Sequence, residues 1–157
     1  MDESQAQSYW KSYLKGFESA TELPTYRRNK ANNSKKNIVS LKRQLPTELE
    51  SKLRTFTRKN KFTLATVMYT AWSILLYKYS SSKDILFGTT VSGRNVDIEN
   101  IENTVGLFIN TLPLRVKISG TETIENILKD INKMLLEREV YDHIPLYEIK
   151  KYSDIVG

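Results

Sequence analysis

The sequence predicts an α/β fold in which a mixed sheet packs against helices, and three observations support this. Two stretches rich in β-branched residues, at 84–91 and 112–118, alternate along the chain with helical patterns. Residues 63–79 are apolar around nearly their whole circumference, which indicates a long, buried central helix. The chain has 157 residues, enough to bury roughly 70% of its unfolded surface without disulfides.

The N-terminal part of the chain combines a helix, a connector and a strand. Apolar residues at helical spacing predict a short helix over 5–15. Residues 23–34 are polar and contain a proline, so we expect a connector there. Over 37–45, Val39 and Leu41 alternate with polar residues, which predicts a half-buried strand.

Two helices are expected next. Pro46 suits the first position of an amphipathic helix. Three residues at helical spacing form its apolar face: Leu49, Leu53 and Phe56. Thr63 is an N-cap residue for the buried helix, which runs to about Tyr79.

The C-terminal half supplies the two strands and two further helices. The strand at 84–91 ends in a Ser-Gly-Arg turn, and the polar stretch 95–104 is expected to be irregular. The strand at 112–118 alternates, which predicts one buried face, with Pro113 near an edge or at the strand's start. Thr123 caps a long helix, and Pro145 opens a short one that ends near Tyr152. The long helix carries one apolar stripe: Ile124, Ile127, Leu128, Ile131, Met134 and Leu135.

Charge and composition limit the classes of function. The net charge is +6, but residues 27–61 carry twelve basic and two acidic residues, a net +10, which leaves −4 elsewhere. This basic segment is either a solvated loop and helix face or a binding site for an acidic partner or nucleic acid. Aromatic residues do not alternate with it as a single-strand stacking surface requires.

The residue inventory excludes several chemistries. With no cysteine and one histidine, a disulfide framework, a thiolate nucleophile, a cysteine-ligated zinc and a paired-histidine site are all excluded. The most apolar stretch, 64–79, is too short and too polar to span a bilayer, and no secretory signal follows Met1. We therefore expect a cytoplasmic protein without a membrane anchor.

Few residues offer catalytic chemistry. His143 is the one side chain suited to proton transfer near neutral pH, but a lone histidine between a helix and a proline is more often a capping or turn residue than a base. Ser92 lies in a strand-ending turn without the surrounding pattern of a nucleophile elbow. Asn110, at the break of an apolar segment, either positions a carbonyl or amide group or caps a local turn. No phosphate loop, dinucleotide motif or metal-ligand spacing is present.

The segment that contains Asn110 resembles a motif of a known family. Residues 105–115 (VGLFINTLPLR) resemble the fifth conserved motif of nonribosomal peptide synthetase condensation domains. The other matches occur in the same order along the chain: 9–14 (YWKSYL), 84–88 (DILFG) with 91–94 (VSGR), and 141–149 (YDHIPLYEI), which resembles the sixth motif.

The resemblance implies a chloramphenicol-acetyltransferase-like fold, with residues 1–157 as the C-terminal lobe of a condensation domain. It places the family's His-His-x-x-x-Asp-Gly motif in an N-terminal lobe and the final motif beyond this chain. In that family, carrier proteins deliver phosphopantetheine-tethered substrates, and the acceptor amine attacks the donor thioester to form an amide. The resemblance implies that the lobe itself binds no cofactor directly and contributes no catalytic residue.

The resemblance also implies a substrate tunnel beside six residues: Ser92, Gly93, Arg94, Gly106, Asn110 and Thr111. Arg94 either pairs with a carboxylate or contacts substrate. An acidic carrier protein would be steered by four basic residues: Lys52, Arg54, Arg58 and Lys59.

Three functions remain open from the sequence. The chain is half of an amide-forming enzyme, inactive without its N-terminal lobe, or a non-catalytic module for carrier binding or dimerisation, or, as a weaker alternative, a basic nucleic-acid-binding protein. An isolated lobe would expose the face that meets its partner, so self-association is expected. The candidates for this exposure are Tyr69, Trp72 and residues 107–109.

Overall fold

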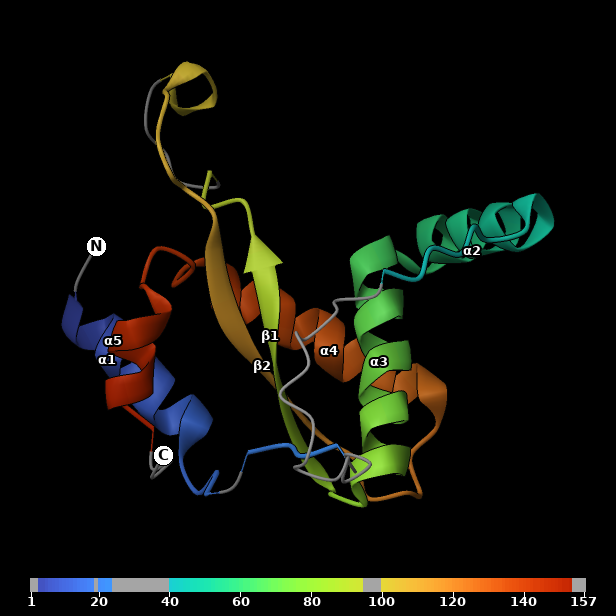
Figure 1. Cartoon of the computed structure of the whole chain (residues 1–157), viewed down its shortest axis with the longest axis horizontal. Coiled ribbons are helices and arrows are strands. Elements are labelled where there is room, and N and C mark those ends of the chain that lie inside the picture. Colours follow the sequence, from blue (N-terminus) through green and yellow to red (C-terminus); the bar gives the residue numbers. More distant parts are fainter. Residues whose placement is uncertain (1–2, 19, 24–39, 95–99, 154–157) are drawn as a thin grey trace, which may run out of the picture.

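Two antiparallel strands lie between two groups of helices (Figure 1). The structure is a computed structural model and describes residues 3–18, 20–23, 40–94 and 100–153. Strand β1 (Asp84–Val91) pairs with β2 (Asn110–Lys117) so that Asp84 faces Lys117 and Val91 faces Asn110. The predicted α/β class is confirmed, and the sheet within the described residues is this antiparallel pair rather than a mixed sheet.

Helices α3 (Leu64–Ser80) and α4 (Ile124–Glu139) enclose the larger core. Both predicted N-caps are confirmed: Thr66 N–H donates to the Thr63 hydroxyl at 3.0 Å, and Asn126 N–H donates to the Thr123 hydroxyl at 3.2 Å. The caps satisfy N–H groups that have no partner within the helix. The buried members of this core are Leu76, Ile85, Leu114, Val116, Ile118, Ile127 and Ile131.

Helices α1 (Glu3–Leu14) and α5 (Leu146–Lys151) lie side by side at the other end of the sheet (Figure 1). They enclose a second core of Trp10, Leu14, Leu112 and Ile149. The predicted helices at 5–15 and after Pro145 are thus confirmed. Because β2 contributes to both cores, it fixes the position of α1 and α5 relative to α3 and α4.

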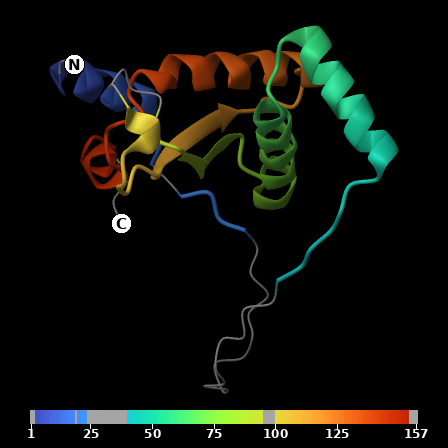
Figure 2. The same ribbon diagram turned by 90° about the horizontal axis from the view of Figure 1, so that it is seen from above.

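Helix α2 (Thr47–Asn60) extends away from the rest of the molecule (Figure 2). The predicted helix is confirmed, with Pro46 at the N-cap rather than the first helical position. Its predicted apolar face is not buried: Leu49 is 43% exposed and Phe56 is 40% exposed. Among the described residues of α2, Thr57 is the one that is buried.

Helix α3 is buried on one side only, which corrects the prediction of a fully buried central helix. Its buried residues include Thr66, Thr70 and Ser73. The Thr70 and Ser73 hydroxyls donate to backbone carbonyls one turn earlier, at 2.8 and 2.7 Å, so these polar groups are satisfied inside the protein. Larger apolar side chains, which we name the α3 stripe, are exposed by 39% or more: Leu64, Met68, Trp72, Leu75 and Tyr79.

The predicted strand at 37–45 is wrong within the described residues, and 37–39 lie outside them. Residues 40–45 form no strand, and Leu41 is 89% exposed. A strand pairs with the free backbone N–H and C=O groups at the edge of a sheet. At the edge formed by β1, the Leu86 N–H already donates to the Thr21 hydroxyl at 2.9 Å and is therefore not free to pair with another strand. The predicted connector at 23–34 lies outside the described residues except for residue 23. The irregular stretch 95–104 is described from residue 100 and contains the 3₁₀ turn η1 (Ile101–Asn103).

Strand β2 is buried on both faces, although its alternating sequence pattern predicted only one buried face. Arg115 is only 7% exposed, between buried Leu114 and Val116. Its guanidinium is satisfied by Asp84 and by backbone carbonyls, and this allows a charged residue to be buried. Pro113 lies opposite Gly88 near the start of the strand, as predicted.

Candidate functional site

The antiparallel register places the end of β1 beside the start of β2, and the described residues 100–109 of the connection extend beyond the strand ends (Figure 1). Gly93 has a φ of +68°, in the left-handed region that glycine tolerates. A Cβ added there would lie 1.8 Å from the Phe108 carbonyl oxygen. A glycine at this position therefore allows the loop to approach the turn closely.

Arg94 holds that loop in place. Its guanidinium donates to the carbonyl of Ile101 and, at 3.1 Å, to that of Thr104. It also lies 4.4 Å from the centre of the Phe108 ring, within the range of a cation–π interaction. Among the described residues, Arg94 binds backbone carbonyls and an aromatic ring and forms no ion pair with a carboxylate, so both predicted alternatives for Arg94 stay predictions.

Asn110 joins the start of β2 to the turn before α5. Its side-chain amide donates to the carbonyls of Asp142 (2.9 Å) and Ile144 (2.7 Å). Its oxygen accepts from the Thr111 N–H at 2.9 Å. The side chain thus fixes the backbone carbonyls on both sides of His143, in keeping with the turn-capping alternative. A role of Asn110 in positioning a carbonyl or amide group of a substrate stays a prediction.

These residues surround a cavity of about 380 Å³, which we name the turn cavity. Two of the predicted site residues, Gly93 and Asn110, line it together with His143. The remaining lining residues are Ile101, Leu107, Phe108, Ile109, Asp142 and Pro145. The arrangement can bind and orient a group, with backbone carbonyls, the Asn110 amide and the His143 imidazole as its polar elements.

The other predicted site residues lie near the turn cavity without lining it. The Ser92 hydroxyl accepts from the Arg94 N–H at 3.3 Å within the turn. Thr111 is exposed, and its methyl group would be 2.9 Å from a Cβ added at Gly88. Gly106 lies beside the Phe108 ring, and a Cβ added to it would be 3.0 Å from the nearest ring carbon. The structure therefore gathers the six predicted residues in one region, with two of them on the cavity wall.

A buried ion pair, missed from the sequence, lies behind the turn cavity. Arg138 is 3% exposed and donates to the Thr89 hydroxyl at 2.8 Å and the Pro113 carbonyl at 3.3 Å. Its Nε lies 3.8 Å from Asp142 Oδ1. Burial raises the pKa of Asp142, and Arg138 opposes that shift. The signal was present in the sequence, because Arg138 continues the apolar stripe of α4 seven residues after Ile131.

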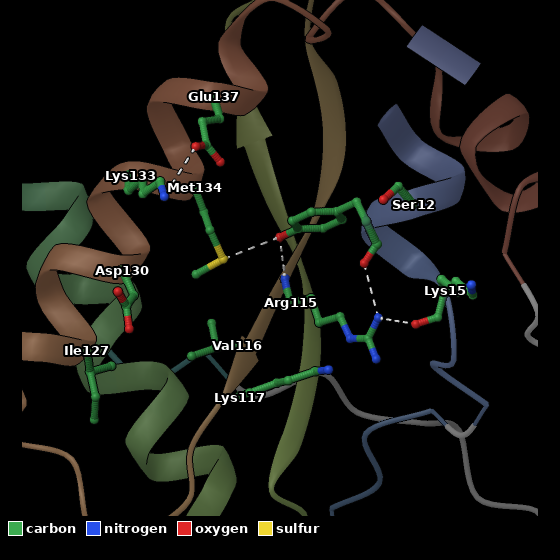
Figure 3. Close-up of a pocket in the computed structure, with 11 residues that line it drawn as sticks. Ser12, Lys15, Arg115, Val116, Lys117, Ile127, Asp130, Lys133, Met134 and Glu137 are labelled. Atoms are coloured by element: carbon green, nitrogen blue, oxygen red, sulfur yellow. Dashed lines mark hydrogen bonds and ion pairs between the residues drawn. The ribbon is translucent and has the colours of Figure 1, made fainter. Parts of the chain in front are cut away.

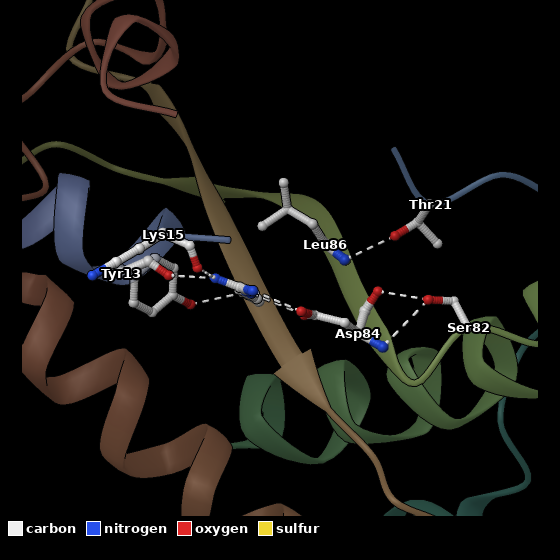
Figure 4. Close-up of polar contacts among 7 residues, drawn as sticks. Tyr13, Lys15, Thr21, Ser82, Asp84 and Leu86 are labelled. Atoms are coloured by element: carbon white, nitrogen blue, oxygen red, sulfur yellow. Dashed lines mark hydrogen bonds and ion pairs between the residues drawn. The ribbon is translucent and has the colours of Figure 1, made fainter. Parts of the chain in front are cut away.

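A second polar cluster joins α1 to the sheet and borders a cavity of about 430 Å³ (Figure 3). The Arg115 N–H donates to the Tyr13 hydroxyl at 2.8 Å, and its guanidinium donates to the carbonyls of Tyr13 and Lys15. It also binds Asp84 through two bonds of 2.9 and 2.6 Å (Figure 4). Hydrogen bonding to Asp84 raises the pKa of Arg115, so the guanidinium keeps its charge. Because all these bonds are internal, the cluster supports the fold.

The four predicted docking residues lie on exposed parts of α2, but they differ in their partners. Lys52 pairs with Glu48 at 2.6 Å, and Arg54 pairs with Glu50 at 2.8 Å, each one helical turn away. Within the described residues, Arg58 and Lys59 form no ion pair. Their charges are therefore the ones least compensated by their own helix.

The described part of the chain lacks two kinds of feature, a cluster of metal-ligand side chains and a membrane-crossing helix. It contains no group of three or more histidine, cysteine, aspartate or glutamate side chains placed to hold a metal ion. None of its helices has the length and apolar character needed to cross a bilayer.

Comparison with known proteins agrees with this architecture. The chain is 38% identical over 156 residues to tyrocidine synthase 2 of Brevibacillus parabrevis, covering 94% of the chain and 4% of that protein. It is 34% identical over 154 residues to bacitracin synthase 3 of Bacillus licheniformis, covering 98% of the chain and 2% of that protein. The chain therefore spans only a small part of the length of these relatives.

Solved structures share the fold at lower identity. The X-domain from teicoplanin biosynthesis superposes with a TM-score of 0.80 at 22% identity, over 98% of this chain and 34% of that one. The first condensation domain of the CDA synthetase superposes with a TM-score of 0.73 at 18% identity, over 92% and 30%. The Condensation domain family matches residues 2–156, so this chain belongs to the condensation-domain family.

Proposed function

We propose that this chain is the C-terminal lobe of a condensation domain and forms amide bonds together with an N-terminal lobe. Its substrates would be aminoacyl or peptidyl groups held as thioesters on carrier proteins. The observation that carries the proposal is the segment 105–115, which resembles the fifth condensation motif and meets the sixth-motif turn at the turn cavity.

The proposed chemistry is a thioester aminolysis. The acceptor amine attacks the donor carbonyl carbon, a C–N bond forms, and the C–S bond breaks. The amine loses a proton and the departing phosphopantetheine thiolate gains one, so the reaction is balanced. The chain contains one histidine, so the paired histidines that the resemblance implies would come from the N-terminal lobe. The phosphopantetheine arm would arrive on the carrier protein.

The residues of this chain would act by positioning. Arg94 holds residues 101–108, while Asn110 holds the carbonyls that flank His143. These contacts keep the turn cavity formed before substrate binds, which lowers the ordering cost of binding. Leu107 is 92% exposed and Ile109 is 66% exposed, so the loop presents apolar side chains outward. These side chains are available to contact substrate or the N-terminal lobe.

The α3 stripe supports the proposal of a partner lobe. It presents five large apolar side chains on one helix face, and exposed apolar surface of this kind marks an interaction site. Trp72, at 43% exposure, fits the predicted partner face, whereas Tyr69 does not, because it packs on the core beside Phe87. Without the lobe, a second copy of the chain would cover the same stripe.

A fusion of this chain behind a histidine-bearing N-terminal lobe from a homologous synthetase tests the function. Donor and acceptor carrier proteins are loaded with aminoacyl groups, and the amide product is measured by mass spectrometry. We expect product from the fusion and at least a tenfold slower rate with Asn110→Ala, because the cavity wall loosens. Asn60→Ala, which removes one exposed bond on α2, is the matched control.

The outcomes separate the alternatives. Full activity of folded Asn110→Ala would contradict a role for Asn110 near the reaction. Carrier binding without any product would favour the non-catalytic module. Salt-sensitive binding to DNA in place of carrier binding would favour the nucleic-acid alternative.

Carrier docking on α2 is tested separately by charge reversal. Because Glu48 and Glu50 already neutralise Lys52 and Arg54, we expect Arg58→Glu and Lys59→Glu to weaken carrier binding more than Lys52→Glu and Arg54→Glu. The effect should shrink as salt rises. Lys129→Glu on α4 is the control, since Lys129 is also an exposed, ion-paired helical lysine. Unchanged affinity and salt dependence in all four α2 variants would refute docking at this face.

A further inference from the structure

Helix α2 carries a second exposed apolar surface besides the α3 stripe. Leu49, Leu53 and Phe56 recur at steps of four and three residues, and we name them the α2 face. Leu49 is 43% exposed, Phe56 is 40% exposed and Leu53 is half-buried. Helix α2 reaches outward from its junction with α3 (Figure 2), so this face stays open to solvent.

The junction between the two helices holds α2 away from the α3 stripe of its own chain. The Phe62 N–H donates to the Thr57 carbonyl at 2.9 Å, and Lys61 has a φ of +58°, which together form a Schellman-type C-cap. The Phe62 ring lies 6.2 Å from the Phe56 ring, the apolar contact that accompanies such a cap. Thr63 caps α3 immediately afterwards. Folding α2 onto its own stripe would therefore cost cap bonds or this ring contact.

The spacing of the α2 face matches that of the α3 stripe. Within the stripe, Met68, Trp72 and Leu75 follow one another at the same steps of four and three residues. Side chains at these steps on two helices interdigitate along a shared seam when the helices pack together. Each surface therefore has the shape that the other requires.

The charges beside the two surfaces do not oppose their contact. Helix α3 has one charged residue, Lys78, so the α3 stripe presents a neutral helix along most of its length. Next to the α2 face, Lys52 is paired with Glu48 and Arg54 is paired with Glu50. The contact would bury apolar side chains and leave these ion pairs at its rim.

We propose that two copies of this chain exchange these surfaces, so that the α2 face of each copy covers the α3 stripe of the other. A two-fold axis makes the contact reciprocal, because every copy offers both surfaces. From their exposed fractions, the side chains of both surfaces together expose on the order of 800 Å² in each copy, the area per partner of a stable interface of standard size. The exchange concerns the chain without an N-terminal lobe and does not depend on the proposed function.

Sedimentation equilibrium of the full 157-residue chain and two double variants tests the reciprocal contact. Leu49→Lys with Leu53→Lys blocks the α2 face, and Met68→Lys with Trp72→Lys blocks the α3 stripe. We expect the original chain to dimerise and each variant alone to associate at least tenfold more weakly. Mixing the two variants should restore part of the dimer, because one of the two contacts is then intact. Leu41→Lys, at an exposed residue outside both surfaces, is the control and should dimerise as the original chain does.

A second measurement does not depend on the blocking variants. The chain contains no cysteine, so Ser51→Cys on α2 carries a single spin label. The labelled chain is mixed with ¹⁵N-labelled original chain, so that any broadening of NMR signals arises between copies. We expect the indole signal of Trp72 to broaden. Trp10 is the internal control, because it is fully buried in the other core and its indole signal should not change.

Three results would overturn the proposal. The first is an original chain that stays monomeric at all concentrations. The second is a folded variant with a blocked α2 face that associates as the original chain does, because the α3 stripe would then pair with another surface. The third is an unchanged Trp72 signal in the mixture with the spin-labelled chain, and this result counts even if a blocking variant fails to fold.

Discussion

Replacing Asn110 with alanine should destabilise the protein measurably, because this side chain makes three hydrogen bonds, two of which join β2 to the turn before α5. Two bonds run to the Asp142 and Ile144 carbonyls and one comes from the Thr111 N–H, with lengths between 2.7 and 2.9 Å. Each net hydrogen bond contributes ~1 kcal/mol, so the free energy of unfolding should fall by about 2–3 kcal/mol. Urea unfolding followed by tryptophan fluorescence and circular dichroism measures this change.

Two further variants sharpen that test. Asn60→Ala removes a single exposed bond to the Phe56 carbonyl and should change stability by less than ~0.5 kcal/mol. Asn110→Asp keeps the acceptor for Thr111 but places a carboxylate against two carbonyl oxygens, which raises the folded-state pKa of the new carboxyl. Its stability deficit should therefore grow as pH rises through that pKa and shrink in acid. A deficit in Asn110→Ala no larger than in Asn60→Ala would refute the positioning role.

Three other predictions concern the turn, one exposed carboxylate and the α3 stripe. Gly93→Ala should lower the free energy of unfolding by about 2–3 kcal/mol, because the new Cβ would sit at a φ of +68° and overlap the Phe108 backbone. Gly16→Ala is the control: Gly16 has a φ of +69° but open space around it, so the decrease should be only ~1 kcal/mol. Hydrogen bonds from Ser119, through its hydroxyl and N–H, and from the Gly120 N–H lower the pKa of Glu122 to about 2. The stabilisation that the Glu122 carboxylate provides is complete at pH values above the pKa of Glu122 in the unfolded chain, and it is lost as pH falls towards 2. Glu122→Gln should therefore be less stable than the original chain at about pH 7 but not at about pH 2. Sedimentation equilibrium should show that the isolated chain self-associates through the α3 stripe. The double variant Met68→Lys with Trp72→Lys should reduce this association, whereas Leu41→Lys, at an exposed residue outside the stripe, should not. A chain that stays monomeric at all concentrations would contradict this prediction.

The sequence predicted the local elements well, because their determinants are local. Thr63 and Thr123 are caps in the structure as in the sequence, and the strand at 84–91 has the predicted bounds. Helix periodicity, capping residues and turn residues act within a few positions, so one sequence suffices to read them.

Burial was predicted less well, because it depends on what each element packs against. Leu41 has the pattern of a strand residue but is 89% exposed where no strand pairs with it. In α3, hydropathy could not show that Thr70 and Ser73 would be buried while Met68 is 52% exposed. The inward side of a helix is decided by its neighbours, and those contacts come from residues distant in the sequence.

The candidate site was predicted by resemblance rather than by pattern. The residues from 92–94 and 105–115 do meet, because the register of β1 and β2 brings their ends together. The partners of Asn110 could not be predicted, since they are backbone carbonyls 32 and 34 residues away. Arg138 was overlooked because a charged side chain by itself suggests a surface position, although its place in the apolar stripe indicated burial. In the structure it is 3% exposed, donates to Thr89 and Pro113 and lies beside Asp142.

Amide formation by the two-lobe fusion decides whether this chain is half of an amide-forming enzyme. With loaded donor and acceptor carriers, we expect amide product from the fusion and none from this chain or the N-terminal lobe alone. Replacing the second histidine of the partner lobe's His-His-x-x-x-Asp-Gly motif with alanine should abolish the product. Amide product from this chain alone, or none from a folded fusion that binds both carriers, would contradict the proposed function.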